Sequence, residues 1–257
     1  MCELVEKHTG ISAKDVIVAS TGVIGQPLDI TPIANGMDEL CKSLNTDGSL
    51  AAAEGIMTTD TRVKEIAVKF NAGGKECVIG GIAKGSGMIH PNMATMLVFL
   101  TSDVNITSEM LQLALSEDVK DSFNMVSVDG DTSTNDMCCI MANGLAGNTV
   151  IDSADSADFA EFKKALFAVT SYLCRMIARD GEGATRLIEV KVDGAKDTST
   201  AKTVAKSVAC SSLLKAAIFG ADANWGRVLC AIGYSGADVE VKKVDVSFKS
   251  KAGKIDV

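Results

Sequence analysis

The sequence has few of the residues on which metal sites, linkers and nucleic-acid surfaces depend. It contains two histidines, and none of its eight cysteines forms a C-x-x-C pair, so a metal site is not expected. Only three prolines are present, which argues against long extended linkers. Acidic side chains outnumber basic ones by 33 to 25, and the resulting net charge of −8 disfavours binding to a phosphate backbone.

Long apolar runs are also missing. No stretch of about 18 uncharged apolar residues occurs, so no transmembrane helix is expected. The first ten residues contain Glu3 and Glu6 and no apolar run, so no secretory signal is expected either. The free cysteines suit a reducing compartment. We therefore expect a protein that meets neither membrane nor nucleic acid and is located in the cytoplasm.

Strand and helix patterns alternate along the whole chain. The composition, 47% hydrophobic and 23% charged, predicts a packed core. We expect an α/β fold of mixed β-sheets layered with helices, forming a single domain over residues 1–257. Strands are predicted at 15–20, 66–70, 77–82, 95–100, 125–128, 188–192 and 244–248. Helices are predicted at 33–42, 50–57 and 198–212, after the cap Thr107, after Asp155-Ser156, and after a cap at Asp222.

A glycine-rich loop that begins at Lys84 leads into the short apolar strand at Thr95. This order places one hydroxyl at the start of a buried strand, beside bare backbone N–H groups. A threonine hydroxyl is a weak nucleophile without a base, but cutting the Ala94–Thr95 bond would free the threonine's own α-amine. That amine, with a pKa of about 7.7–8.0, could accept the hydroxyl proton near neutral pH. A tight loop followed by an ordinary β-branched strand residue would explain the same pattern without catalysis.

Three other segments carry polar groups in turns. Ser20-Thr21-Gly22 could present a hydroxyl and a backbone N–H to an oxyanion, although such tripeptides are common in turns. The acidic loop 129–136 lacks the spacing of a calcium loop, and turns stabilised by its own side chains explain it equally well. Glu182 lies in a glycine-flanked turn, where it could bind an ammonium group or face solvent.

Five segments taken together resemble one known family. Residues 84–97, K-G-S-G-M-I-H-P-N-M-A-T-M-L, closely resemble the self-cleavage segment of the bifunctional ornithine acetyltransferase/glutamate N-acetyltransferase (ArgJ) family of arginine biosynthesis. Four more segments match that family in order along nearly the whole chain, which is far stronger evidence than a single motif. They are 20–25 (S-T-G-V-I-G), 128–136 (V-D-G-D-T-S-T-N-D), 179–185 (R-D-G-E-G-A-T) and 219–227 (F-G-A-D-A-N-W-G-R).

The resemblance implies a self-processing acetyltransferase with an N-terminal threonine nucleophile. Cleavage between Ala94 and Thr95 would give an α-chain part, 1–94, and a β-chain part, 95–257, which would associate as an α2β2 heterotetramer. Thr95 would take acetyl from N-acetylornithine and pass it to glutamate in a ping-pong cycle. No cofactor would be bound, and acetyl-CoA would be a further substrate in bifunctional members.

The resemblance also assigns residue roles. Thr21 and the Gly22 N–H match the family's oxyanion hole. Its substrate contacts match Thr58, Lys84, Thr95 and Glu182.

Two features depart from the family pattern. His90 stands where a small residue is more usual. The family's chains extend beyond both ends of this one, and their C-terminal substrate-binding Asn and Thr lie past Val257. Two alternatives stay open: an N-terminal-nucleophile amidohydrolase or aminopeptidase that gives its acyl group to water, and an inactive, truncated amino-acid-binding domain.

Overall fold

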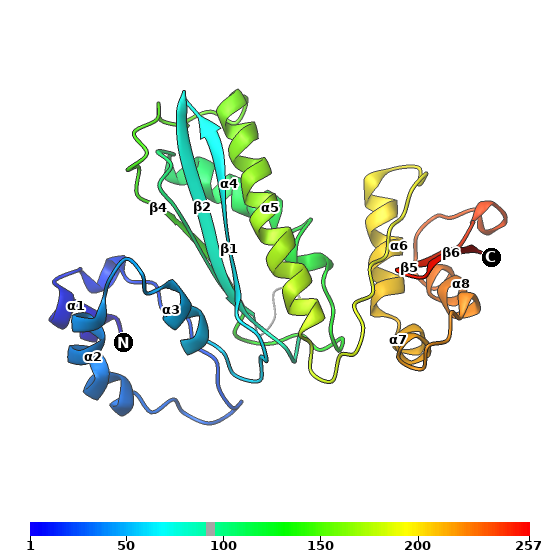
Figure 1. Ribbon diagram of the computed structural model, residues 1–257, viewed down its shortest axis with the longest axis horizontal. Helices are drawn as coiled ribbons and strands as arrows, with labels where there is room; N and C mark the ends of the chain where they lie inside the picture. The colour runs from blue at the N-terminus through cyan, green and yellow to red at the C-terminus, as the bar shows by residue number, and fades with distance from the viewer. Residues whose placement is uncertain (91–95) are drawn as a thin grey trace.

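A four-stranded mixed sheet forms the centre of the computed structural model, which describes residues 1–90 and 96–257 (Figure 1). Its strands, in spatial order, are β1 (Lys64–Ala72), β2 (Lys75–Lys84), β3 (Leu97–Ser102) and β4 (Met137–Ala142). The pairs β1–β2 and β2–β3 are antiparallel, and β3–β4 is parallel. The expectation of a mixed-sheet α/β fold is confirmed. The predicted junction, Ala94 and Thr95, lies outside the described residues.

The turn between β1 and β2 depends on two adjacent glycines. Gly73 and Gly74 have φ of 53° and 73°, in the left-handed region that favours glycine. They connect Ala72 directly to its register partner Lys75. A two-residue turn with two positive φ angles matches the twist of antiparallel strands, so the hairpin follows from the sequence N-A-G-G.

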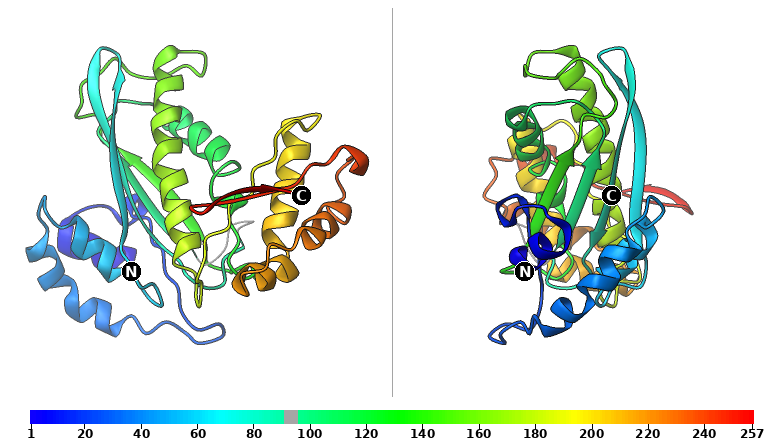
Figure 2. Two further views of the ribbon diagram at one scale, coloured as in Figure 1. Left: turned by 45° about the vertical axis from the view of Figure 1, so that its right-hand side comes forward. Right: turned by 90° about the vertical axis from the view of Figure 1, so that its left-hand side faces the viewer.

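Two helices complete the central core. The side chain of Ser156 caps α5 (Ala157–Arg179), and that of Thr107 caps α4 (Ser108–Asp118). α5 lies along β1 and β2, and α4 packs against α5 (Figure 2). The apolar stripe that α5 presents to the sheet recurs near the helical period. Its buried members include Phe159, Phe162, Leu166, Val169 and Leu173.

The N-terminal residues form three helices at one side of the sheet: α1 (Cys2–Thr9), α2 (Thr31–Ser43) and α3 (Ser49–Gly55) (Figure 1). The predicted strand at 15–20 is wrong. A 3₁₀ turn, η1 (Ala13–Asp15), is followed by backbone that joins no sheet of the described chain. An apolar run becomes a strand only where a neighbouring strand completes its hydrogen bonds, and here Ile17 is 63% exposed.

The C-terminal residues pack around a second apolar cluster. Three helices surround it: α6 (Thr198–Cys210), α7 (Ser212–Phe219) and α8 (Trp225–Gly233). The hairpin β5 (Ser247–Ser250) and β6 (Gly253–Asp256) follows them on the same side of the molecule (Figure 1). The buried members of the cluster are Val204, Val208, Leu214, Ala231 and Ile232.

Three further predictions in this half need correction. Residues 188–192 form no strand. Met125 ends a 3₁₀ turn, η2 (Phe123–Met125), and 126–128 is irregular, so neither predicted run belongs to a sheet of the described chain. The cap of α8 is Asn224, whose side chain accepts the Arg227 N–H, rather than Asp222. All the cysteines are free thiols. Within the described ranges, no helix combines the length and the apolarity needed to cross a bilayer.

Candidate active site

Three of the predicted substrate-contacting side chains meet where β2 ends. Lys84 is the last residue of β2 and is 3% exposed, and its Nζ donates to Thr58 Oγ1 at 2.9 Å. Glu182 lies in the turn after α5, where its Oε1 accepts from Thr59 Oγ1 at 2.6 Å. The Glu182 N–H donates to Ser86 O at 2.8 Å. Segments far apart in sequence thus place a buried ammonium and a carboxylate at one location.

The ammonium of Lys84 is only partly satisfied by protein. Burial lowers its pKa, Lys64 lowers it further, and Asp60 and Glu182 oppose both effects. An ammonium has three donors. The hydroxyl of Thr58 takes one of them, and no second acceptor occurs within the described ranges. Lys84 is therefore suited to bind an anionic group of a ligand.

A buried ion triad lies behind these side chains. Lys64 is 1% exposed, and its Nζ donates to Asp60 Oδ1 at 2.6 Å and to Asp180 Oδ2 at 2.7 Å. Asp60 also accepts the N–H of Thr58 at 3.2 Å and that of Gly85 at 2.8 Å. The triad therefore ties together the turn before β1, the end of β2 and the end of α5.

Hydrogen bonds keep both carboxylates of the triad ionised. Burial alone would raise the pKa of Asp60, but donation from Gly85, Lys64 and Thr58 together lowers it. Burial likewise opposes ionisation of Asp180, and donation from Lys64 and Thr61 lowers its pKa. At neutral pH the triad therefore carries two negative charges around one positive charge.

The glycine-rich loop passes directly against Glu182. A Cβ added to Gly87 would lie 2.6 Å from the Glu182 carboxylate, so only glycine allows this approach. The next residues are held by Asp129, whose carboxylate accepts the N–H of Met88 at 2.6 Å and that of Ile89 at 3.0 Å. Met88 has a positive φ of 55°, a strain that these two bonds help to hold.

The side chain of His90 contacts the last residue of α6. Its Nδ1 lies 3.1 Å from Ser127 Oγ and 3.5 Å from Cys210 Sγ. Burial lowers its pKa, and the cations Lys206 and Lys215 lower it further. The imidazole is therefore neutral at pH 7.

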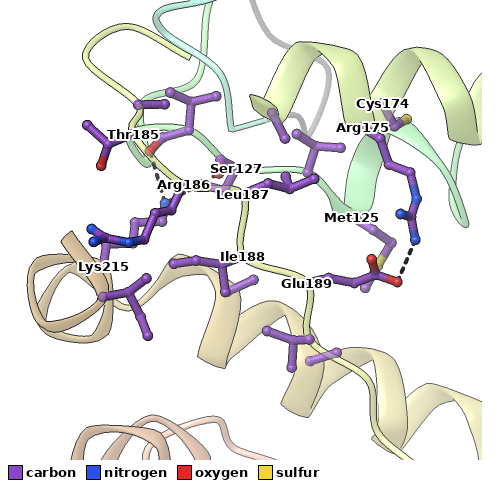
Figure 3. A pocket seen from close by; sticks show the side chains of 18 of the residues that line it. Met125, Ser127, Cys174, Arg175, Thr185, Arg186, Leu187, Ile188, Glu189 and Lys215 are labelled. Carbon is purple, nitrogen blue, oxygen red and sulfur yellow. Dashed lines mark hydrogen bonds and ion pairs between the residues drawn. The ribbon is translucent and has the colours of Figure 1, made fainter. Parts of the chain in front are cut away.

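A cleft of about 650 Å³ lies beside Glu182, between the end of α5 and the helices α6 and α7 (Figure 3). Its volume is in the range of small-molecule sites. The extended segment 184–190 runs along it, and an ion pair joins Arg175 to Glu189 at 2.5 Å across one wall (Figure 3). Arg186 and Lys215 make its lining basic in part. Among the described residues no cluster of His, Cys, Asp or Glu could hold a metal ion.

The contacts described above do not include two pairs of residues that were predicted to belong to the site. Ala94 and Thr95 lie outside the described residues. Thr21 and Gly22 lie in the irregular segment between η1 and α2, and in the described chain neither bonds to Lys84, Glu182 or their neighbours. Their assignment to an oxyanion hole stays a prediction.

Sequence reasoning missed the triad and the acids of the 129–136 loop as site residues. One signal for Lys64 was available: it has the same parity as the inward-facing Ile66, Val68 and Phe70, so a strand places its side chain in the core. A buried lysine needs a counter-charge, and the acidic residues of the matched motifs were candidates. Which of them meets Lys64 depends on tertiary structure.

Comparison with known proteins gives a consistent result. A family model described as "ArgJ family" matches residues 1–256. The arginine biosynthesis bifunctional protein ArgJ 1 of Clostridium acetobutylicum is 53% identical over 256 residues, covering 100% of this chain and 62% of the relative. The arginine biosynthesis bifunctional protein ArgJ of Caldanaerobacter subterraneus subsp. tengcongensis is 49% identical over 257 residues, covering 100% of this chain and 64% of the relative.

A solved structure is similar as well. The crystal structure of arginine biosynthesis bifunctional protein ArgJ from Bacillus halodurans matches with 54% sequence identity and a TM-score of 0.54. The match covers 55% of this chain and 66% of that one. The chain spans 62% and 64% of the length of the two curated relatives above.

Proposed function

The chain belongs to the ArgJ family, and from this membership we propose that it is part of an acetyltransferase that moves acetyl from N-acetylornithine to glutamate. The observation that carries the proposal is the convergence of Thr58, Lys84 and Glu182 at the end of β2. A buried ammonium and a carboxylate suit a zwitterionic amino acid, whose carboxylate and ammonium each need a partner. Acetyl-CoA is an additional acetyl donor for glutamate in this proposal.

Thr95 is the proposed nucleophile of two reactions. In self-processing, its hydroxyl attacks the Ala94 carbonyl, the peptide C–N bond breaks, and water hydrolyses the resulting ester. The products are an α part, 1–94, and a β part, 95–257, which stay associated, as α2β2 in the assembled protein. In turnover, the freed amine of Thr95 accepts the hydroxyl proton as the hydroxyl attacks N-acetylornithine.

The remaining residues bind and orient in this proposal. Thr21 and the Gly22 N–H stabilise the oxyanion of each tetrahedral intermediate. Lys84 and Glu182 hold the amino-acid backbone charges of the substrate, and Thr58 orients Lys84. Ornithine leaves the acetyl-enzyme, and glutamate takes up the acetyl group as N-acetylglutamate.

The processing step is tested with the Thr95→Ala variant in the full chain. The parent protein is expected to give two fragments on a denaturing gel, one with Thr95 as its first residue by N-terminal sequencing. The variant should remain uncut. Thr101→Ala, which changes an exposed threonine of β3, is the matched control and should be cut normally. Cleavage of the Thr95→Ala chain at the same bond would rule out the proposed nucleophile.

A product assay separates transfer from hydrolysis. With N-acetylornithine and glutamate, the proposal expects N-acetylglutamate to form at the rate at which ornithine appears. Steady release of acetate that does not depend on glutamate would instead identify an amidohydrolase on the same scaffold. An uncut chain that takes up no acetyl group would identify an inactive amino-acid-binding domain.

A further inference from the structure

The Glu182 carboxylate is held by one of its two oxygens. Oε1 accepts from Thr59 Oγ1 at 2.6 Å, and within the described ranges Oε2 accepts no hydrogen bond. The backbone of Gly87 lies against the carboxylate, since a Cβ added there would lie 2.6 Å from its carbon and from both oxygens. Glu182 raises the pKa of Lys84 through its charge, but no ion pair joins the two in the described chain. One carboxylate oxygen is therefore available to a ligand.

A second hydroxyl supports the hydroxyl of Thr59. Ser86, in the loop after β2, is 1% exposed, and its Oγ lies 2.5 Å from Thr59 Oγ1. A hydroxyl has a single proton to donate. Because the proton of Thr59 goes to Glu182, the hydroxyl of Ser86 donates to Thr59. The two hydroxyls form a directed chain that ends at the Glu182 carboxylate, and each donation strengthens the next.

The backbone on both sides of Thr59 is anchored to the buried ion triad. Before it, the N–H of Thr58 donates to Asp60 Oδ2 at 3.2 Å. After it, the N–H of Thr61 donates to Asp180 Oδ2 at 2.9 Å, and the hydroxyl of Thr61 donates to the other oxygen of the same carboxylate. Thr59 therefore has a fixed position from which to direct the exposed side chain of the glutamate.

Two adjacent hydroxyls serve the two opposite charges of the site. Thr58 accepts from the ammonium of Lys84, and Thr59 donates to the carboxylate of Glu182. Consecutive Cα atoms are about 3.8 Å apart, so the turn itself limits how far the two charges can separate. A free amino acid carries its carboxylate and its ammonium on one carbon. A short, fixed spacing of opposite charges suits such a ligand.

We propose that Thr59 and Ser86 are positioning residues that direct the Glu182 carboxylate toward the ammonium of the ligand and so determine the preference for ligands that carry one. The inference rests on the proposed function, in which Glu182 binds that ammonium. Without the hydroxyl of Thr59, the exposed side chain of Glu182 is free to turn into solvent. Lys84, which Thr59 does not contact, still binds the carboxylate of the ligand.

The test compares the binding of glutamate and glutarate to the full chain by ligand-observed NMR titration. Glutarate has the same carbon chain and both carboxylates but no ammonium, so the ratio of the two dissociation constants reports recognition of the ammonium alone. The parent protein should prefer glutamate. Thr59→Val has nearly the same shape without the hydroxyl, and it should bind glutamate about tenfold more weakly and glutarate as the parent does. Ser86→Ala should change the ratio in the same direction by a smaller factor.

Two further variants control for structural effects. Thr59→Ser keeps the hydroxyl and should keep the parent ratio. Thr46→Val changes an exposed threonine in the loop before α3 and should also keep it. A Thr59→Val protein that retains the parent ratio, or that loses affinity for both ligands equally, would overturn the inference. A parent protein that does not prefer glutamate to glutarate would instead contradict the roles that the proposed function gives to Lys84 and Glu182.

Discussion

At the scale of single residues, Lys64 holds several segments of the site together through its hydrogen bonds. Among the described residues, its ammonium is the one group that bonds both Asp60 and Asp180. Asp60 in turn accepts the N–H groups of Thr58 and Gly85, and Asp180 lies two residues before Glu182. The alternation of inward and outward side chains along a strand could predict that Lys64 points inward. It could not identify the acids that pair with Lys64, because Asp180 is 116 positions away in sequence.

Removing this ammonium should destabilise the fold strongly. Lys64→Met leaves two buried carboxylates without their counter-charge, and we expect a loss of about 3–5 kcal/mol in the free energy of unfolding. Urea denaturation measures it. Lys69→Met is the control: Lys69 pairs with Glu76 on the exposed side of the same strand, where water screens the pair, so this variant should lose little stability. Equal losses in the two variants would contradict the described triad.

The triad also predicts a pH dependence of stability. Its carboxyls have folded-state pKa values below the ordinary 3.8, so they stabilise the fold above that pH and cease to do so as pH falls through the lowered values. Stability measured by denaturation should therefore drop below about pH 4. In Lys64→Met the unpaired acids gain by protonation, so the gap between variant and parent should narrow as pH falls. A gap that stays constant from pH 7 to pH 3 would contradict this.

At the scale of elements, the sequence predicted best those turns and helix ends whose geometry depends on a few adjacent residues. The β1–β2 hairpin follows from its glycine turn. α4 begins at the predicted cap Thr107, and α5 begins after Asp155-Ser156 as predicted. The strand predicted at 15–20 failed because alternation and β-branching do not supply a partner strand. Residues 188–192 also lack a partner strand, and this segment lies along the cleft instead.

The hairpin turn offers a matched pair of variants. Both glycines have positive φ, but a Cβ at Gly73 would lie 2.8 Å from Thr149 N, whereas a Cβ at Gly74 meets nothing within 4 Å. Gly74→Ala should therefore cost about 1–2 kcal/mol of stability for its backbone strain alone. Gly73→Ala should cost clearly more, since it adds a clash with backbone. Thermal unfolding compares them, and a larger loss in Gly74→Ala would show that the turn is packed differently.

Gly87, in the glycine-rich loop after β2, lies directly against the Glu182 carboxylate of the site. Because a side chain there would meet the Glu182 carboxylate at 2.6 Å, Gly87→Ala should displace that carboxylate and weaken substrate binding. We expect KM for N-acetylornithine to rise about tenfold or more, the effect of losing one charged contact. Gly183→Ala, with a φ of 69° and nothing within 4 Å, controls for strain in the neighbouring turn. Unchanged KM in Gly87→Ala would argue against a binding role for Glu182.

At the scale of the whole molecule, the described chain has two separate apolar clusters. One joins the sheet to α4 and α5, and the other lies among α6, α7 and α8. The exposed apolar side chains are frequent in the N-terminal segment, where Val23 and Ile24 are 72% and 70% exposed. Composition predicted a packed core but not its division, because hydrophobic periodicity reports the buried face of each element and not the element it packs against.

This division predicts unequal local stability. Amide hydrogen exchange should be slowest in β2, β3 and α5, whose bonds are surrounded by the larger cluster. It should be faster in α6 to α8 and fastest in the segment from 16 to 30. Mass spectrometry of labelled peptides measures the order. Protection at 16–30 as strong as that of β2 would show that this segment is packed as a strand.

The family resemblance implied that Thr58, Lys84 and Glu182 belong to one site, and the structure brings these three residues to one location. The proposed role of Thr95 as nucleophile needs a chemical test. The most direct test treats the protein with N-acetylornithine in the absence of glutamate and maps its peptides by mass. The account predicts one acetyl group on the peptide that begins with Thr95, which disappears when glutamate is added and is recovered as N-acetylglutamate. A protein that turns over N-acetylornithine while its chain runs unbroken through Ala94 and Thr95 would contradict the account.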